Sequence, residues 1–293
     1  MTDSVEHVPR ERGSVWQADI ASIVILLLFV LLMFGVERWL DPTFTETGLL
    51  LTGVVIALVP AFIWLGFFYR RDRLEPEPKH LVFQLFVLGG ILAAAIGVPL
   101  VDGLFDVPSW LRSSPLWAQL LGGWLIVGCV QEFLVYTAVR FSVYNSAEFD
   151  EETDGVVYAT AAGIGYATLL NIVFVVSSGG VALGSGSVRI VLTTLAHASF
   201  AGVIGYFLGR QKFEKRPHYW MPLGLLVASA INGLFFLFRG MISTGGISGA
   251  GGTANTWLGL LLAVVLTGIV TAAISQAIHN NVEEALAKAG GAA

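Results

Sequence analysis

Two ionisable side chains, Glu132 and His197, stand inside long apolar blocks of this 293-residue sequence. Amides accompany them: Gln131 precedes Glu132, and Asn171 and Asn232 lie in two further apolar blocks. Buried peptide hydrolysis needs these residue types, since a carboxylate can act as general base and an imidazole can stabilise an oxyanion or hold a metal. We therefore predict Glu132 and His197 as catalytic residues, with the three amides as supporting polar groups.

The same two side chains are the predicted ligands for zinc or another divalent metal. A catalytic zinc takes three protein ligands and keeps an open position, so two good ligands predict no tightly held ion. The sequence contains neither HExxH nor GxSxG. Ser199 is two residues from His197 and points elsewhere on a helix, so a serine dyad is not predicted.

A structural interpretation competes with the catalytic one. Glu132 and His197 would then form a hydrogen-bonded pair that ties two helices, and Asn171 and Asn232 would bind neighbouring helices in the same way. Asp154 is counted among the supporting polar residues, but its simplest role is the N-cap of a helix that starts near Gly155.

These residues are embedded in a membrane protein. Hydrophobic residues make up 55% of the chain, charged residues only 13%, and the mean hydropathy is +0.76. Because about 20 apolar residues cross a bilayer, we predict an all-α, polytopic transmembrane bundle of about eight spans. Their predicted ranges are 19–39, 47–69, 81–102, 116–140, 155–177, 189–209, 220–239 and 256–278.

The distribution of lysine and arginine predicts how the bundle is oriented in the membrane. With the N-terminus inside, 12 of the 16 lysines and arginines fall in inner segments, as the positive-inside rule requires. We therefore predict that both termini are cytoplasmic, with a leader at 1–18, the bundle at 19–280 and a tail at 281–293. The net charge of −5 argues against a nucleic-acid partner.

Small residues predict which spans meet. Gly155, Ala159, Gly163 and Ala167 recur every four residues before Asn171, and a similar series follows His197 at Ala201, Gly205 and Gly209. Such stripes let two helix backbones approach closely. We predict that the spans at 155–177 and 189–209 pack together, and that the Gly/Ser-rich stretch 179–187 between them is a flexible external loop.

Five sequence motifs resemble those of the PrsW-type membrane peptidases, which are distantly related to the CAAX-processing and bacteriocin-processing membrane proteases. The resemblance runs from about residue 67 to residue 238. The motifs, in chain order, are FFYRRDRLEPEPKHLVFQLFVLGG, VQEFLVY, DGVVYATAAGIGYATLLN, LTTLAHASFAGVIGYFLG and INGLFF.

The resemblance implies a set of site residues, some kept and some replaced. Glu132 matches the second of two paired glutamates, and His197 matches the central histidine. Gln131 stands at the first glutamate, and Asn232 at a final histidine. The family's Glu-Asn pair falls on Leu170 and Asn171, next to a Gly-Phe-Ala stretch that reads Gly-Tyr-Ala here. A lysine falls on Val135, whereas Asp154, Gly155 and Tyr158 match.

Three functions follow from these observations. The resemblance implies a membrane-embedded peptidase that cuts other membrane proteins, in an integral protein of a prokaryotic cytoplasmic membrane. The replaced positions favour a non-catalytic relative that binds transmembrane segments as a sensor, scaffold or regulator. A proton-coupled transporter using Glu132 and His197 as a relay is a third hypothesis. The predicted partners are a transmembrane protein and the surrounding lipid.

Overall fold

The computed structural model describes residues 13–71, 77–214, 216–245 and 253–290. Within these ranges the ordered elements are all helical, and eight helices are long and apolar enough to cross a membrane. The all-α transmembrane fold and its eight spans are thus confirmed. The longer elements are α1 (Gly13–Gly35), α2 (Glu46–Arg71), α3 (Lys79–Leu92), α6 (Cys129–Ser142), α7 (Glu152–Ser177), α8 (Leu183–Phe213), α9 (Trp220–Gly245) and α10 (Thr253–Gly290).

The third and fourth spans are interrupted by π-helical turns. In the third span, α3 continues through π-helical Ala93–Gly97 and Pro99–Leu104 before the short α4 (Val107–Trp110). In the fourth, α5 (Leu116–Gly122) passes through π-helical Gly123–Gly128 into α6. The spanning stretch Lys79–Ser113 is therefore longer than the predicted 81–102. Such turns are rare and are often found at functional sites.

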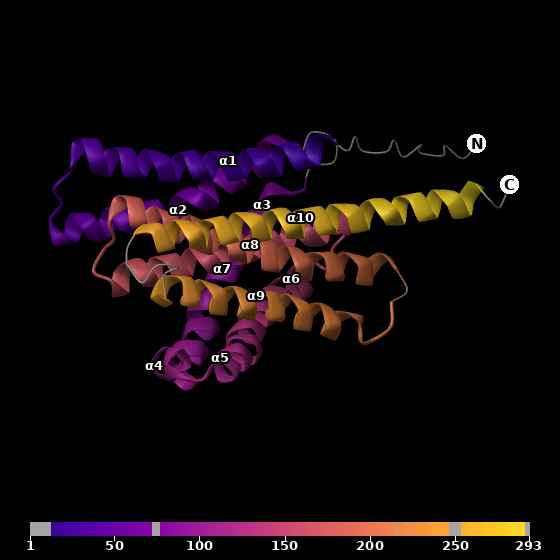
Figure 1. The fold of residues 1–293 in the computed structure, drawn as a ribbon. Helices are drawn as coiled ribbons and strands as arrows, with labels where there is room; N and C mark the ends of the chain where they lie inside the picture. The colour runs from indigo at the N-terminus through magenta and orange to yellow at the C-terminus, as the bar shows by residue number, and fades with distance from the viewer. Residues whose placement is uncertain (1–12, 72–76, 215, 246–252, 291–293) are drawn as a thin grey trace.

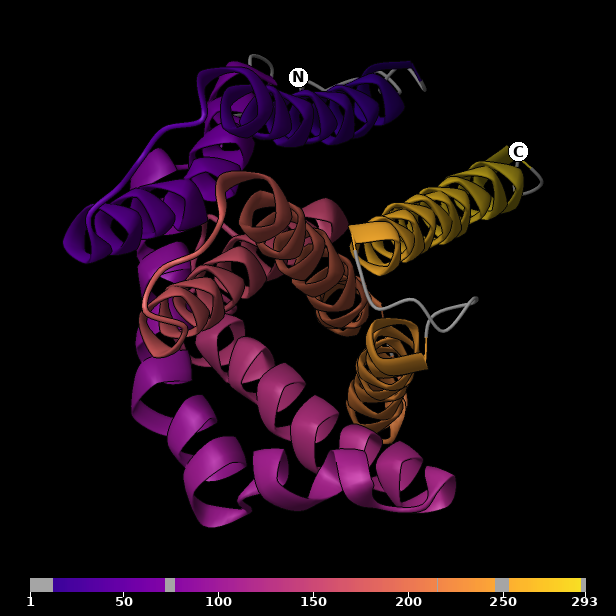
Figure 2. The same cartoon turned by 60° about the vertical axis from the view of Figure 1, so that its left-hand side comes forward.

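The bundle is built around α7 and α8. In the spanning window of α8, 83% of residues are buried, against 61% in α7, 22% in α10 and 11% in α1. Figures 1 and 2 agree that α1 and the segment with α4 and α5 lie on opposite sides of these two helices, with α10 at the outside. Side chains on α7 and α8 are therefore shielded from lipid on most sides.

The predicted contact between α7 and α8 is confirmed. A Cβ built at Gly205 would lie 2.2 Å from the Gly155 carbonyl oxygen, and one at Gly209 would lie 2.1 Å from that of Glu152. At Gly163 it would meet the Ala201 Cβ at 2.5 Å. Any larger side chain would force these backbones apart, so the small-residue stripes are what allow the antiparallel pair to form.

The predicted loop at 179–187 is partly wrong. The turn contains Gly179 and Gly180 at φ +68° and +111°, but α8 already begins at Leu183. The backbone N–H of Gly184 donates to the Glu37 carboxylate at 2.5 Å, and an added Cβ would meet that carboxylate at 2.8 Å. The Gly/Ser composition therefore serves close packing as well as a turn.

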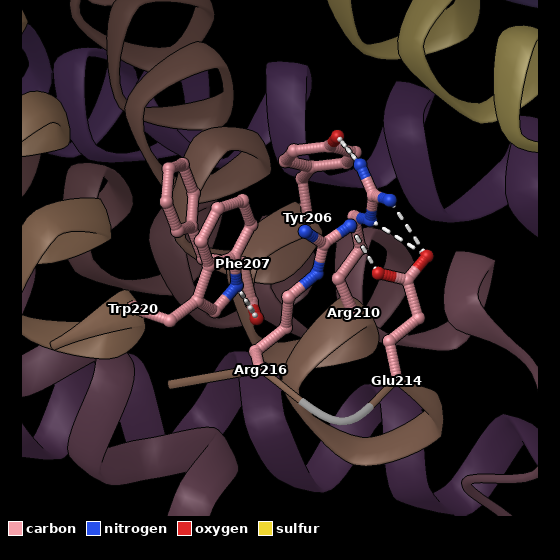
Figure 3. Close-up of polar contacts among 6 residues, drawn as sticks. All are labelled: Tyr206, Phe207, Arg210, Glu214, Arg216 and Trp220. Atoms are coloured by element: carbon pink, nitrogen blue, oxygen red, sulfur yellow. Dashed lines mark hydrogen bonds and ion pairs between the residues drawn. The ribbon is translucent and has the colours of Figure 1, made fainter. Parts of the chain in front are cut away.

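At its other end, α8 is joined to α9 by a dense polar cluster (Figure 3). Arg210 donates to Glu214 at 2.6 and 3.0 Å and to the Tyr206 hydroxyl at 2.6 Å, and Arg216 forms a second ion pair with Glu214. The Trp220 indole donates to the Phe207 carbonyl at 3.1 Å. Each charge in this cluster is paired, which holds the connection between the two helices.

The predicted leader and tail fall partly outside the described residues. Helix α1 includes residues 13–18 of the leader, whereas residues 1–12 are not described. Helix α10 extends to Gly290 within the predicted tail, and residues 291–293 are not described. The Gly13 end of α1 and the Gly290 end of α10 lie on the same side of the bundle (Figure 1), as an even number of spans requires.

Candidate active site

Glu132 lies in the first turn of α6, directly after the π-helical turn, and only 1% of its surface is exposed. Its Oε1 accepts a hydrogen bond from Asn232 Nδ2 at 2.8 Å. Its Oε2 is buried and has no hydrogen-bond partner among the described residues. A buried carboxyl oxygen without a partner costs free energy, so the fold tolerates here a group that is suited to accept a proton.

Asn232 joins α9 to α6. Its Nδ2 donates to Gln131 Oε1 at 2.9 Å as well as to Glu132. The two helices approach closely at this level, because a Cβ at Gly128 would lie 2.3 Å from the Ser229 carbonyl oxygen. The structure therefore brings together three of the predicted site residues. Since both amide protons of Asn232 are used, its role is to position Glu132.

His197 lies on α8 and is 7% exposed. Its ring is stacked on Tyr166, with centroids 5.7 Å apart, and it meets the edge of Phe200 at 5.6 Å. The main chain at His197 is pressed against α7, where a Cβ at Gly163 would lie 2.9 Å from its carbonyl oxygen. The imidazole is thus held inside the bundle by aromatic contacts and is turned away from lipid.

Tyr166 is the site residue that sequence reasoning missed. It is 1% exposed, and its hydroxyl has no hydrogen-bond partner within the described part of the chain. Its ring stacks on His197 and packs with Val130 and Leu134 of α6. Tyr166 therefore contacts one predicted catalytic residue, His197, and lies against the helix that carries the other. The available signal was a tyrosine where the resembling motif has phenylalanine.

Asn171 does not join this group. Its Nδ2 donates to the Ile190 carbonyl at 3.2 Å and to Thr194 Oγ1 at 3.3 Å, both on α8. Thr194 is one turn before His197, so this amide secures the helix that carries the histidine. The structure supports the interhelical role for Asn171.

Asp154 also lies elsewhere, and its prediction as an N-cap is wrong. Glu151 is the N-cap of α7, and Asp154 is the third helical residue of the capping box. Its Oδ2 accepts from the backbone N–H groups of Asp150 and Glu151 at 2.8 and 2.7 Å. Asp154 precedes Tyr166 by 12 residues, which is roughly 18 Å along a helix. It therefore serves the start of α7.

Comparison with known proteins decides the family. Residues 77–269 match the sequence profile described as PrsW family intramembrane metalloprotease. The chain belongs to the PrsW family. It is 29% identical to Protease PrsW of Bacillus subtilis over 180 residues, which cover 61% of this chain and 78% of that protein. The PrsW proteases of Geobacillus kaustophilus and Clostridioides difficile are 28% and 27% identical, over 75% and 76% of their lengths.

These relatives identify the chain as a peptidase-family protein integral to a prokaryotic membrane. No solved structure matches the chain at a significant level.

The family description implies a metal, and the side chains present can be compared with that expectation. Among the described residues, no three histidine, cysteine, aspartate or glutamate side chains come together as a metal-binding group. Glu132 and His197 supply two ligands, whereas a catalytic zinc takes three. Gln131 and Asn232 are neutral amides already paired with each other. The donor set of this PrsW-family member therefore does not fit a tightly held zinc.

Proposed function

We propose that this PrsW-family protein is a membrane-embedded endopeptidase that cuts transmembrane segments of other membrane proteins, with Glu132 as the general base. One observation carries the proposal: the buried carboxylate of Glu132 keeps one oxygen hydrogen-bonded to Asn232 and the other without a partner in the described residues. Glu132 lies 10 residues before the end of its span at Ser142, roughly 15 Å along a helix. A substrate at that depth is a membrane segment.

The chemistry follows from this arrangement. Asn232 holds Oε1, and Oε2 takes a proton from water while the water oxygen bonds to the scissile carbonyl carbon. The carbonyl oxygen becomes an oxyanion, which His197 stabilises by hydrogen bonding. When the C–N bond breaks, the proton held by Glu132 passes to the amine nitrogen. No redox partner is needed, and the carboxylate is regenerated.

Replacement of Glu132 by glutamine tests the proposal. Glutamine keeps the shape and can still accept from Asn232, but it cannot take up a proton. Cleavage of a panel of labelled peptides with about 20 apolar residues, measured in proteoliposomes by mass spectrometry, is expected to fall at least about 100-fold. Glu214→Gln is the matched control, because Glu214 lies in the polar cluster at the end of α8 (Figure 3).

Bacillus subtilis PrsW serves as the positive control for the assay. If it cleaves members of the panel while the purified wild-type chain cleaves none, the proposal is wrong. Equal cleavage by wild type and Glu132→Gln, at equal amounts of folded protein, would also overturn it.

A non-catalytic relative that binds transmembrane segments is the second candidate. It is favoured by the neutral side chains Gln131, Leu170 and Asn232, where the family motifs carry ionisable groups. This candidate predicts that the chain captures a transmembrane partner, and that Glu132→Gln captures the same partner equally well. Capture that is lost in Glu132→Gln would favour the peptidase.

A further inference from the structure

We infer that the Tyr166 hydroxyl is a third catalytic group, which donates a hydrogen bond to the oxyanion of the reaction in the proposed function. Buried hydroxyl groups are nearly always hydrogen-bonded. The Tyr166 side chain is 1% exposed, yet its Oη has no partner among the described residues. This inference rests on the proposed peptidase activity.

The position of Tyr166 supports this role. Its ring is stacked on His197 of α8, and it packs in one apolar cluster with Val130 and Leu134 of α6. Tyr166 on α7 thus lies against the His197 imidazole of α8 and against α6, the helix that carries Glu132.

The third span leaves room for the hydroxyl at Gly97. A Cβ there would lie 2.0 Å from Tyr166 Oη and 2.8 Å from Cζ. Gly97 ends the π-helical turn that begins at Ala93, so the backbone there departs from a regular α-helix. Any other residue at 97 would displace the phenol, which makes Gly97 a positioning residue for Tyr166.

The chemistry of a phenol limits its part in the reaction to donation. A tyrosine phenol keeps its proton at neutral pH and stabilises an oxyanion by donating a hydrogen bond, without transferring the proton. The family motif carries a glutamate at the position of Leu170, one helical turn after Tyr166 and on the same face of α7. The described side chains provide only two metal ligands. The tyrosine O–H therefore polarises the substrate carbonyl by hydrogen bonding, as a metal ion would otherwise do.

Tyr166→Phe removes this hydroxyl and little else. In proteoliposomes with the labelled peptides, we expect kcat to fall about 100-fold with KM nearly unchanged, as when one oxyanion donor is removed. Tyr206→Phe is the matched control: Tyr206 contacts Arg210 at the end of α8, and its variant is expected to keep the wild-type kcat. Rates are expressed per folded molecule, determined by size-exclusion chromatography.

Gly97→Ala and the double variant complete the test. Gly97→Ala is expected to lower kcat to a similar extent, and the double variant with Tyr166→Phe is expected to be no slower than Tyr166→Phe alone. Additive losses would overturn the inference, as would a raised KM at unchanged kcat in Tyr166→Phe. If Glu132→Gln is inactive while Tyr166→Phe is fully active, this inference alone fails. If Glu132→Gln is fully active, the proposed function fails first.

Discussion

Two helix pairs in this protein, α7–α8 and α6–α9, are built by the same means. In each pair a glycine brings the backbones together: Gly205 lies against Gly155 in the first, and Gly128, directly before α6, lies against Ser229 in the second. In each pair an asparagine reaches across to the other helix: Asn171 bonds to α8, and Asn232 bonds to α6. Sequence alone does not distinguish the two.

The difference lies in what each asparagine holds. Asn171 bonds a backbone carbonyl and a hydroxyl, which are neutral groups that also bond within α8. Asn232 bonds the Glu132 carboxylate, whose second oxygen is left without a described partner. Asn171 thus serves the fold, whereas Glu132 is an ionisable group inside a span, which membrane proteins mostly keep for function.

The largest effect on folding is expected from Gly205→Ala. The added methyl would lie 2.2 Å from the Gly155 carbonyl, and α8 is too enclosed to move aside, so unfolding should become easier by about 3 kcal/mol. Thermal unfolding followed by size-exclusion chromatography measures this. Gly268→Ala, with no atom within 4 Å of the added Cβ, is the control and should be neutral.

Gly128→Ala applies the same test to α6–α9. That span is 44% buried in its window against 83% for α8, so α6 can shift, and the loss of stability should be smaller than for Gly205→Ala. The shift would separate Glu132 from Asn232. Cleavage per folded molecule should therefore fall more in Gly128→Ala than in Gly205→Ala. Equal stability losses with unchanged cleavage in both variants would contradict the comparison.

The next largest effects are expected when each asparagine is replaced by leucine, and they should differ between the two helix pairs. Asn232→Leu leaves the Glu132 carboxylate with no described partner, which should cost about 3 kcal/mol of stability and lower cleavage about 10-fold. Asn171→Leu removes only neutral hydrogen bonds and should cost about 1 kcal/mol with cleavage near wild type. Parallel melting and peptide-cleavage assays measure both; a larger cleavage loss in Asn171→Leu would reverse our assignment of roles.

Much of the fold could be predicted because the physical signals are strong. Eight apolar blocks near bilayer length predicted the eight spans, and the four-residue spacing of small residues predicted the α7–α8 contact. An ionisable residue in an apolar block marked Glu132 and His197 as candidates, and the structure places both inside the bundle. Their catalytic roles are still predictions.

Other features could not be predicted, since they depend on contacts distant in the sequence. The hydrogen bonds from Asn232 to Gln131 and Glu132 join residues about a hundred positions apart, and no pattern within either span selects that partner. In the sequence Tyr166 is one aromatic in an apolar block, and only the fold places its hydroxyl against Gly97 with no hydrogen-bond partner among the described residues. Gly184 and Gly186 resembled a loop because tight helix packing uses the same residue types as a flexible linker.

The smallest expected effect is at Ser229, which compares a buried hydroxyl with the ionisable Glu132. This residue is fully buried on α9, and its Oγ has no hydrogen-bond partner in the described part of the chain, yet it lies one turn before Asn232. Because this hydroxyl is not ionisable, we expect it to take no part in the chemistry, so Ser229→Ala should raise stability by up to about 1 kcal/mol with unchanged cleavage.

Ser199→Ala is expected to change stability in the opposite direction to Ser229→Ala. The Ser199 hydroxyl donates to the Leu195 carbonyl at 2.8 Å and lies 3.0 Å from Thr267 Oγ1, so its removal should lower stability by about 0.6 kcal/mol. Both variants are measured by thermal unfolding and by peptide cleavage. A drop in cleavage in Ser229→Ala would contradict this expectation and would extend the site one turn along α9.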